Sequence, residues 1–271
     1  IVLLSRELKP LKNLAQTLRS RSPDATDTLP THGVPTEVRP LLDALNHLFA
    51  RTQAMMARER RFTSDAAHEL RSPLAALKVQ TDVAQLSHDD PEAQSKALGQ
   101  LHAGIDRASR LVDQLLTLSR LDSLDNLDDV EPVAMADLLQ SAVLDIWHPA
   151  QQAGLDVRLN VNAPDVMRHG QPLLLSLLVR NLLDNAVRYS PRGSVVDVTL
   201  NTQGFTVRDN GAGISPDALA RIGERFYRPP GQDATGSGLG LSIVKRIAAL
   251  HGMRVSLGNA PEGGFEVAVS W

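Results

Sequence analysis

His68 has neighbours that would support nucleophilic chemistry on its imidazole. Glu69 follows it directly, and Ser72 lies one helical turn further on and shares a face with it. A neutral imidazole nitrogen is a nucleophile, and an unperturbed histidine supplies one near neutral pH. Glu69 can orient the other ring N–H and take up a proton, while Pro73 removes a backbone N–H beside the site. The segment would suit group transfer to nitrogen, whereas a structural or surface role is the expectation for most of the other seven histidines.

The same segment does not fit a zinc site. The His-Glu-x-x-His pattern of zinc-binding helices needs a second histidine, but Arg71 and Ser72 stand there instead. The chain has no cysteine, so disulfides, thiolate chemistry and cysteine-based metal sites are excluded as well.

Two clusters in the C-terminal half would suit a nucleotide and its metal ion. Asn181 and Asn185 stand one turn apart on a predicted helix and face the same way. Carboxamide oxygens suit Mg²⁺, which takes few protein ligands and fills its shell with water and phosphate oxygens. Asp209 follows a predicted strand, and its carboxylate can accept a hydrogen bond from an exocyclic amine. Gly211 and Gly213 behind it allow a ligand to approach the backbone.

Two further clusters follow in order. Glu224–Arg228 precedes a Pro-Pro-Gly turn, and the run Gly236–Leu241 opens a predicted helix, where free backbone N–H groups can bind phosphates. Each cluster alone has an ordinary alternative, namely surface amides, a tight turn or a glycine hinge. The glycine run also lacks the spacing of a dinucleotide fingerprint and follows a loop rather than a first strand. The four clusters together nevertheless favour a nucleotide site.

The elements that must position His68 are long helices. A helical apolar pattern runs from Glu37 to Leu86, interrupted only by Pro73, which can kink the helix. The turn Ser87–Pro91 starts another helix, whose apolar positions continue to Leu118. We predict that this pair forms a helical hairpin and that two hairpins form a four-helix bundle. A dimer is the simplest way to cover an apolar stripe of this length.

The flanking segments are shorter and less regular. A short helix is predicted over Ser5–Leu18, the stretch Arg19–Pro35 is predicted to be irregular, and the acidic segment Asp122–Glu131 is predicted to be a linker. Beyond Pro132, helices and strands alternate, and short turns indicate a mixed sheet. Helices are predicted near Met135–Ala153, Pro172–Tyr189, Pro216–Arg221 and Leu239–His251. Strands are predicted near Leu155–Val161, Ser194–Leu200, Phe205–Arg208, Met253–Leu257 and Glu262–Val269.

Length and composition limit the class of protein. The 271 residues exceed the usual size of one domain, so two or more folded units are expected. A net charge of −3 is too small to indicate nucleic-acid binding as the main task. A membrane-spanning helix needs about 18 consecutive apolar residues, and the sequence contains no such run. The chain opens at Ile1 without an initiator methionine, which would fit either a fragment cut just after a membrane helix or a trimmed soluble piece.

Together these motifs resemble those of the bacterial two-component sensor histidine kinases. The four C-terminal clusters resemble the N, G1, F and G2 boxes of their ATP-binding domain, and Phe62–Leu74 resembles their phospho-acceptor box. Residues 1–57 resemble a HAMP signal-relay module, with Pro10 and Glu37 at its two marker positions. The resemblance implies an α + β multidomain chain. A HAMP-like helical module over 1–57 would precede a dimeric phosphotransfer hairpin over 58–126. A two-layer α/β sandwich of the Bergerat type over 127–271 would bind ATP.

The resemblance also implies roles for single residues. His68 would accept the phosphate, with Glu69 and Ser72 assisting, and Asn185 would ligate Mg²⁺. Asp209 would bind the adenine amine. The remaining residues implied to bind ATP are Asn181, Arg188, Tyr189, Gly211, Gly213, Arg228, Gly236, Gly238, Leu239 and Gly240. Ser72 stands where relatives with phosphatase activity usually have Thr or Asn, so phosphatase activity on the phosphorylated regulator is possible.

Three functions remain in competition. The resemblance favours a kinase on the cytoplasmic face of the bacterial inner membrane, homodimeric, which phosphorylates His68 and passes the phosphate to an aspartate of a response regulator. A plain Bergerat ATPase is the alternative, but related ATPases carry a glutamate base where this chain has Asn181, and an amide cannot take a proton from water. The third is a non-catalytic scaffold, against which the complete set of nucleotide clusters argues.

Overall fold

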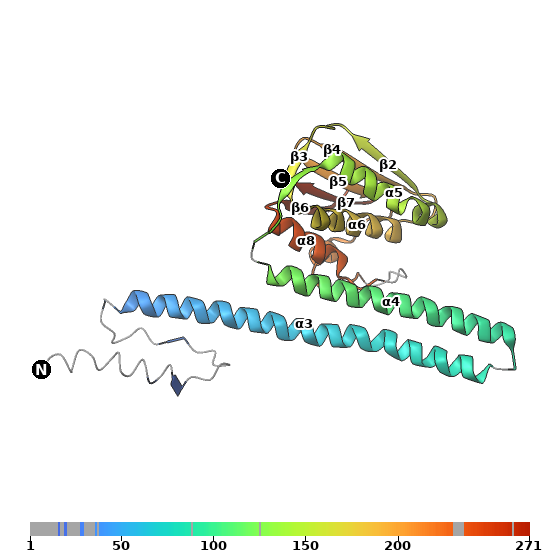
Figure 1. Cartoon of the computed structure of the whole chain (residues 1–271), viewed down its shortest axis with the longest axis horizontal. Helices are drawn as coiled ribbons and strands as arrows, with labels where there is room; N and C mark the ends of the chain where they lie inside the picture. Colours follow the sequence, from blue (N-terminus) through green and yellow to red (C-terminus); the bar gives the residue numbers. More distant parts are fainter. Residues whose placement is uncertain are drawn as a thin grey trace, which may run out of the picture. The chain divides into compact units, whose positions relative to one another are not determined.

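The computed structural model describes residues 16, 19–20, 28–29, 36, 38–87, 89–124, 126–229, 236–261 and 263–271. The chain divides into two compact units, Ile1–His68 and Glu69–Trp271. Helix α3 (Arg39–Leu86) begins in the first unit and ends in the second (Figure 1). Within the described residues, no helix has both the length and the apolar character that a membrane crossing needs.

The first unit packs around two leucines. Leu29 and Leu42 are 2% and 0% exposed. The Asn46 side chain binds the backbone of Leu29 twice, accepting from its N–H at 2.7 Å and donating to its carbonyl at 3.2 Å. Arg19 and Ser20 are helical, so helical structure extends beyond the predicted end at Leu18. Most of the predicted Ser5–Leu18 helix, together with Pro10 and Glu37, lies outside the described residues.

Helix α3 and helix α4 (Pro91–Ser123) form the predicted hairpin. Asp90 caps α4 because its Oδ1 accepts from the N–H groups of Glu92 at 3.1 Å and Ala93 at 3.0 Å. The two helices approach each other closely at Gly104 of α4 and Leu77 of α3. A Cβ atom at Gly104 would lie 2.7 Å from Leu77 Cδ2, so the glycine permits the close approach of the two helices.

The helix boundaries refine two predictions. Helix α3 continues through Pro73, as the pattern predicted. The predicted linker Asp122–Glu131 was too long at both ends: α4 extends to Ser123, and a strand begins at Glu131. The acidic composition suggested a linker, but Leu121 is 2% exposed, and its burial favours continuing the helix to this point.

A five-stranded mixed sheet forms the centre of the C-terminal region, as predicted. Its order is β2-β4-β5-β7-β6, with β2 parallel to β4 and all other neighbours antiparallel. The strands are β2 (Asp156–Val161), β4 (Val195–Asn201), β5 (Gly204–Asp209), β6 (Arg254–Asn259) and β7 (Phe265–Ser270). Alternate residues of β4 and β5 are buried, which is the period-two pattern of a sheet with one face on a core.

Helices cover one face of this sheet (Figure 1). They are α5 (Met135–Ala153), α6 (Pro172–Tyr189) and α8 (Gly240–Leu250), with the single turn α7 (Pro216–Leu219) in a loop. Helices α5 and α6 have the predicted bounds, because Gly154 ends the first in a left-handed conformation and Pro172 starts the second. The arrangement is the predicted two-layer α/β sandwich.

A second, two-stranded sheet was not predicted. Strand β1 (Glu131–Ala134) pairs antiparallel with β3 (Met167–Gly170). Four-residue strands give no periodic signal, and the proline at position 132 is untypical of a strand because it cannot donate to a ladder. Strand β1 of this small sheet lies in the connection between α4 and α5.

His251 ties the end of α8 to the start of α6. Its Nε2 accepts from the Gln171 backbone N–H at 3.1 Å, and its Nδ1 lies 2.8 Å from the carbonyl oxygen of Ile247, to which it donates. Burial lowers the pKa of His251 from 6.5, and the hydrogen bond to Ile247 partly opposes this. The fold therefore favours the neutral form of this imidazole.

The free energy of unfolding should fall in acid because of this histidine. Below pH 6.5 the unfolded chain binds a proton that folded His251 does not, so stability falls as pH drops from 6.5 through the lower folded pKa and then levels off. His251→Gln should lower stability at pH 8 by about 1–2 kcal/mol and flatten this slope. Denaturant unfolding followed through Trp147 and Trp271 measures both, with the exposed His169→Gln as control. An unchanged slope in His251→Gln would contradict the assignment.

Candidate functional site

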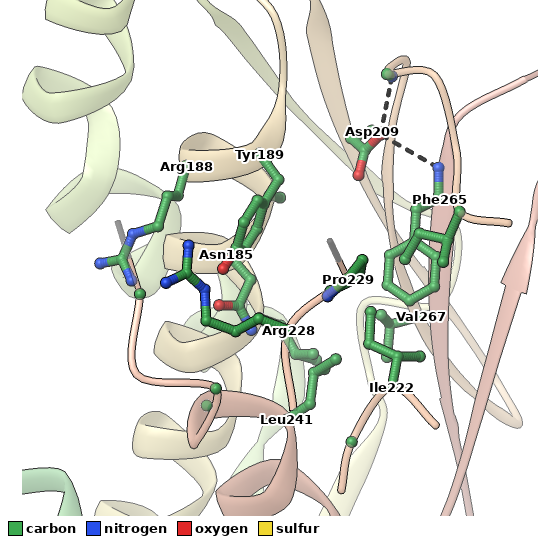
Figure 2. A pocket seen from close by; sticks show the side chains of 18 of the residues that line it. Asn185, Arg188, Tyr189, Asp209, Ile222, Arg228, Pro229, Leu241, Phe265 and Val267 are labelled. Carbon is green, nitrogen blue, oxygen red and sulfur yellow. Dashed lines mark hydrogen bonds between the residues drawn. The ribbon is translucent and has the colours of Figure 1, made fainter. Parts of the chain in front are cut away.

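A pocket of about 290 Å³ lies between α6, the end of β5, strand β7 and the start of α8 (Figure 2). It is lined by most of the residues implied to bind ATP, namely Asn185, Arg188, Tyr189, Asp209, Gly211, Gly213, Arg228, Gly236, Gly238 and Gly240. Asn181 and Leu239 are buried beside it rather than in its lining. The fold thus gathers residues between Asn185 and Gly240 into one site.

Asp209 supplies a buried carboxylate at one side of the pocket. The side chain is 7% exposed, and its Oδ1 accepts from the N–H groups of Gly211 at 2.8 Å and Phe265 at 3.1 Å. Within the described residues, this carboxylate accepts two hydrogen bonds, and both are accepted by Oδ1. Oδ2 can therefore accept from a donor placed in the pocket, such as an aromatic amine.

Two residues that the sequence did not single out hold the Asp209 loop. A Cβ atom at Gly264, whose φ is +90°, would collide with the backbone oxygen of Asp209, so only glycine fits there. Asn259 braces the loop at Ile214, accepting from its N–H at 2.8 Å and donating to its carbonyl at 2.6 Å. The Gly263-Gly264 pair was the only sequence signal for the contact of Gly264 with Asp209. Nothing in the sequence indicated the contact of Asn259 with Ile214.

The opposite side of the pocket is cationic. Figure 2 shows the guanidinium groups of Arg188 and Arg228 on the side away from Asp209, with Tyr189 and Asn185 close to them. The glycine run lies against this side, since a Cβ atom at Gly236 would lie 2.8 Å from the Tyr189 hydroxyl and 3.4 Å from an Arg188 nitrogen. An amine acceptor at one side and cations at the other suit a molecule with a base and phosphates.

The two asparagines meet the start of α8. A Cβ atom at Gly240 would lie 3.1 Å from Asn185 Nδ2 and 3.3 Å from both Asn181 Oδ1 and Asn185 Oδ1. Asn181 donates its Nδ2 to the Leu177 carbonyl at 2.8 Å, which leaves its Oδ1 on the Gly240 side. Within the described residues no group of three or more His, Asp or Glu side chains could hold a metal ion. The amide oxygens of Asn181 and Asn185 near Gly240 suit a hard cation that keeps water and phosphate ligands.

The residues that the sequence predicts to act in phosphate acceptance stand on α3. His68 is exposed and is the last residue of the first unit. Glu69 and Ser72, in the second unit, line a separate cavity together with residues of α4. The pocket and this cavity share Gln114, Arg188, Arg228, Gly236 and Ser237.

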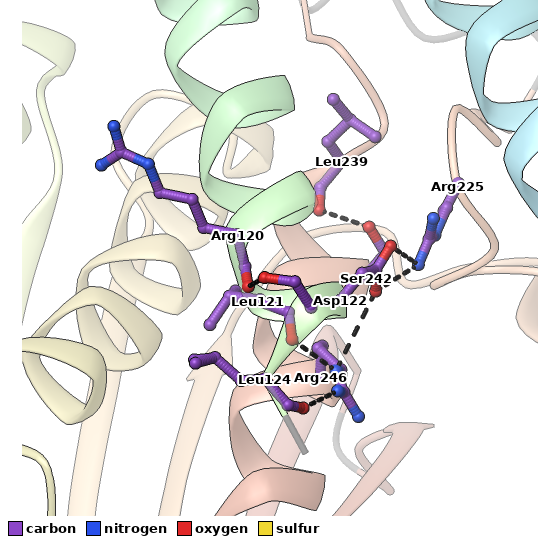
Figure 3. Close-up of polar contacts among 9 residues, drawn as sticks. Arg120, Leu121, Asp122, Leu124, Arg225, Leu239, Ser242 and Arg246 are labelled. Carbon is purple, nitrogen blue, oxygen red and sulfur yellow. Dashed lines mark hydrogen bonds and ion pairs between the residues drawn. The ribbon is translucent and has the colours of Figure 1, made fainter. Parts of the chain in front are cut away.

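Helix α4 is joined to the pocket-bearing sandwich by polar contacts (Figure 3). Arg246 of α8 donates to the carbonyl oxygens of Leu121 at 3.0 Å and Leu124 at 2.6 Å, which caps the end of α4. Asp122 forms an ion pair with Arg225 at 2.8 Å. The sequence did not indicate these contacts, because each joins residues more than 100 positions apart.

Comparisons with known proteins match this arrangement. Residues 170–271 match the family described as histidine kinase-, DNA gyrase B- and HSP90-like ATPase, residues 58–124 match the His Kinase A (phospho-acceptor) domain, and residues 8–54 match the Sensor protein PhoQ-like HAMP domain. The chain is 31% identical over 261 residues to Sensor protein BasS of Escherichia coli (strain K12), covering 95% of this chain and 70% of BasS. A solved structure of full-length ShkA in complex with AMPPNP is 27% identical with a TM-score of 0.57, covering 78% of this chain and 45% of ShkA.

The chain therefore belongs to the sensor histidine kinases. Within that family it is similar along its whole length to Sensor protein QseC: the protein of Salmonella typhimurium (strain LT2) is 73% identical over 271 residues. The chain spans 60% of the length of that relative. The predicted domain boundaries at 57 and 126 stay predictions.

Proposed function

We propose that this chain transfers the terminal phosphoryl group of ATP to His68 and that the phosphate then passes to an aspartate of a response regulator. The observation that carries the proposal is the polarity of the pocket, in which a buried acceptor, Asp209, faces a cationic side formed by Arg188 and Arg228. A purine base with an exocyclic amine and a triphosphate fits this order of groups. The AMPPNP complex of ShkA supports a nucleotide of this kind.

The proposed roles follow from the chemistry of each group. Asp209 Oδ2 accepts from the adenine amine, and Tyr189 lies against the base. Arg188 and Arg228 bind phosphate oxygens, and the backbone N–H groups at Gly236–Gly240 bind them as well. Leu239 is 0% exposed, so its contribution is to hold the start of α8 rather than to contact the nucleotide with its side chain.

Asn185 is the proposed protein ligand of Mg²⁺, with Asn181 beside it. Their amide oxygens converge near Gly240, and such neutral donors suit a cation whose other ligands are phosphate oxygens and water. When bound, Mg²⁺ would offset negative charge on the phosphates. The protein groups then have to position the triphosphate and keep water from attacking the terminal phosphorus, which would hydrolyse ATP.

The transfer step balances without a further reactant. An imidazole nitrogen of His68 attacks the terminal phosphorus, a P–N bond forms, and the P–O bond to ADP breaks. The proton on the other ring nitrogen can pass to Glu69 or to solvent. Asn181 favours this outcome over hydrolysis, because its amide cannot remove a proton from water. Ser72 would orient a water molecule that attacks the phosphoaspartate of the regulator, which breaks its P–O bond and releases inorganic phosphate.

A homodimer through the hairpin is the proposed assembly. Exposed apolar residues follow both helices of the hairpin, among them Leu74, Val79, Val83, Leu98, Ile105, Val112 and Leu116. A second hairpin would cover them in a four-helix bundle. By its similarity to QseC, the chain is proposed to act on the cytoplasmic side of a membrane, with a QseB-type response regulator as partner.

The fate of the terminal phosphate distinguishes a kinase from an ATPase. The chain is incubated with γ-labelled ATP and Mg²⁺, and protein-bound label and free phosphate are counted together. We expect label to accumulate on the protein and to be lost in acid but kept in alkali, with slow release of free phosphate. Steady phosphate release without labelled protein would favour the ATPase. Failure to bind ATP at all would favour a scaffold.

A further inference from the structure

The cavity beside the nucleotide pocket is larger than the pocket itself. It has a volume of about 750 Å³, against about 290 Å³ for the pocket. One wall is helix α4, and Glu69 and Ser72 of α3 lie on another. Because five residues line both spaces, the cationic side of the pocket opens into this cavity.

The charge of the cavity lining is strongly positive. Arg107 and Arg110 come from α4, and Arg188 and Arg228 come from the sandwich. Glu69 is the one carboxylate among the residues that line it within the described chain. Four guanidinium groups around one space favour an anion with several oxygens, because each group offers paired N–H donors to phosphate.

Helix α4 also reaches the nucleotide pocket itself. Gln114 lines the pocket, and its Oε1 accepts from the hydroxyl of Ser237 at 2.6 Å. Ser237 stands inside the glycine run, and its oxygen accepts from the Leu239 N–H at 3.2 Å. The hairpin is thus in contact with the loop that is proposed to bind phosphates.

Arg110 of α4 and Arg188 of the sandwich line the same cavity. Arg188 and Arg228 also line the nucleotide pocket. The charge of Arg110 therefore acts on the space that adjoins the cationic side of the pocket.

We propose that Arg107 and Arg110 bind the terminal phosphate of ATP, so that the hairpin completes the nucleotide site. This inference rests on the proposed function. The sandwich alone would hold the base and the first two phosphates. The third phosphate would extend into the cavity that Glu69 and Ser72 line, where the α4 arginines compensate its charge. The hairpin would thereby sense whether a nucleotide carries the transferable phosphate.

The test compares two nucleotides that differ in the terminal phosphate. Dissociation constants of AMPPNP and ADP with Mg²⁺ are measured for the whole chain, for R107Q and R110Q, and for the double variant. The double variant should bind AMPPNP about tenfold or more weakly while its ADP affinity is retained. Both positions are exposed, and glutamine keeps helix propensity close to that of arginine, so the fold should persist. R120Q makes the same change on α4 at a position that lines neither space, and it should behave like the unaltered chain.

Each other outcome has a separate meaning. Equal loss of AMPPNP and ADP affinity would overturn the inference, because the arginines would then act on docking of the hairpin rather than on the terminal phosphate. Unchanged affinity for both nucleotides would overturn it too, and would leave the proposed function standing. If the unaltered chain bound neither nucleotide, the proposed function itself would fail.

Discussion

His68→Gln should abolish transfer of label from γ-labelled ATP to the chain while ATP binding survives. Glutamine has no nucleophilic nitrogen, so protein-bound label should fall by at least about two orders of magnitude. The position is exposed on a helix, and glutamine is a good helix former, so the substitution should not disturb the fold. The nucleotide pocket is lined by residues of the second unit and should bind ATP as before.

His102→Gln is the matched control for this experiment. His102 is also an exposed histidine on the hairpin, and its Nδ1 lies 3.1 Å from the Leu98 carbonyl oxygen of its own helix. Labelling should therefore continue in His102→Gln. Full labelling of His68→Gln, or loss of labelling in both variants, would remove His68 as the acceptor.

Asp209→Asn should invert the base preference of the pocket. The asparagine Oδ1 can keep the hydrogen bonds from Gly211 and Phe265, but its Nδ2 replaces the acceptor that the adenine amine requires. ATP affinity should fall about tenfold to a hundredfold, since a buried donor would be left facing a donor. Inosine triphosphate carries a carbonyl oxygen in place of that amine and should bind the variant better than ATP does.

Competition binding with the two triphosphates measures this preference directly. Asp145→Asn, at an exposed position of α5, is the control and should leave it unchanged. A general loss of affinity for both nucleotides would indicate damage to the loop. An unchanged preference for ATP in Asp209→Asn would place the base elsewhere.

The elements that surround the site could be predicted because their signals are local. Helical periodicity with Gly154 or Pro172 at a boundary gave the bounds of α5 and α6, and alternating burial is typical of β4 and β5. Strands β1 and β3 gave no such signal, because four residues are too few for a period and Pro132 masks the first.

The sequence indicated several residues that line the pocket, but it did not indicate the groups that support them. Asp209, Asn185 and the glycine run belong to compact motifs, whereas the groups that hold them come from distant positions. Phe265 lies 56 residues from Asp209, and Asn259 lies 45 residues from Ile214. Such contacts depend on strand order, which periodicity does not encode. The charge of the second cavity could not be anticipated either, because it needs arginines of α4 and of the sandwich to line one space.

The most direct measurement is the location of the transferred phosphate. The chain is incubated with ATP and Mg²⁺, digested at alkaline pH to preserve a P–N bond, and analysed by tandem mass spectrometry. We predict phosphate on the imidazole of His68 in the peptide that also contains Glu69. Phosphate on any other side chain, or its absence from the protein while ATP is consumed, would contradict the central claim.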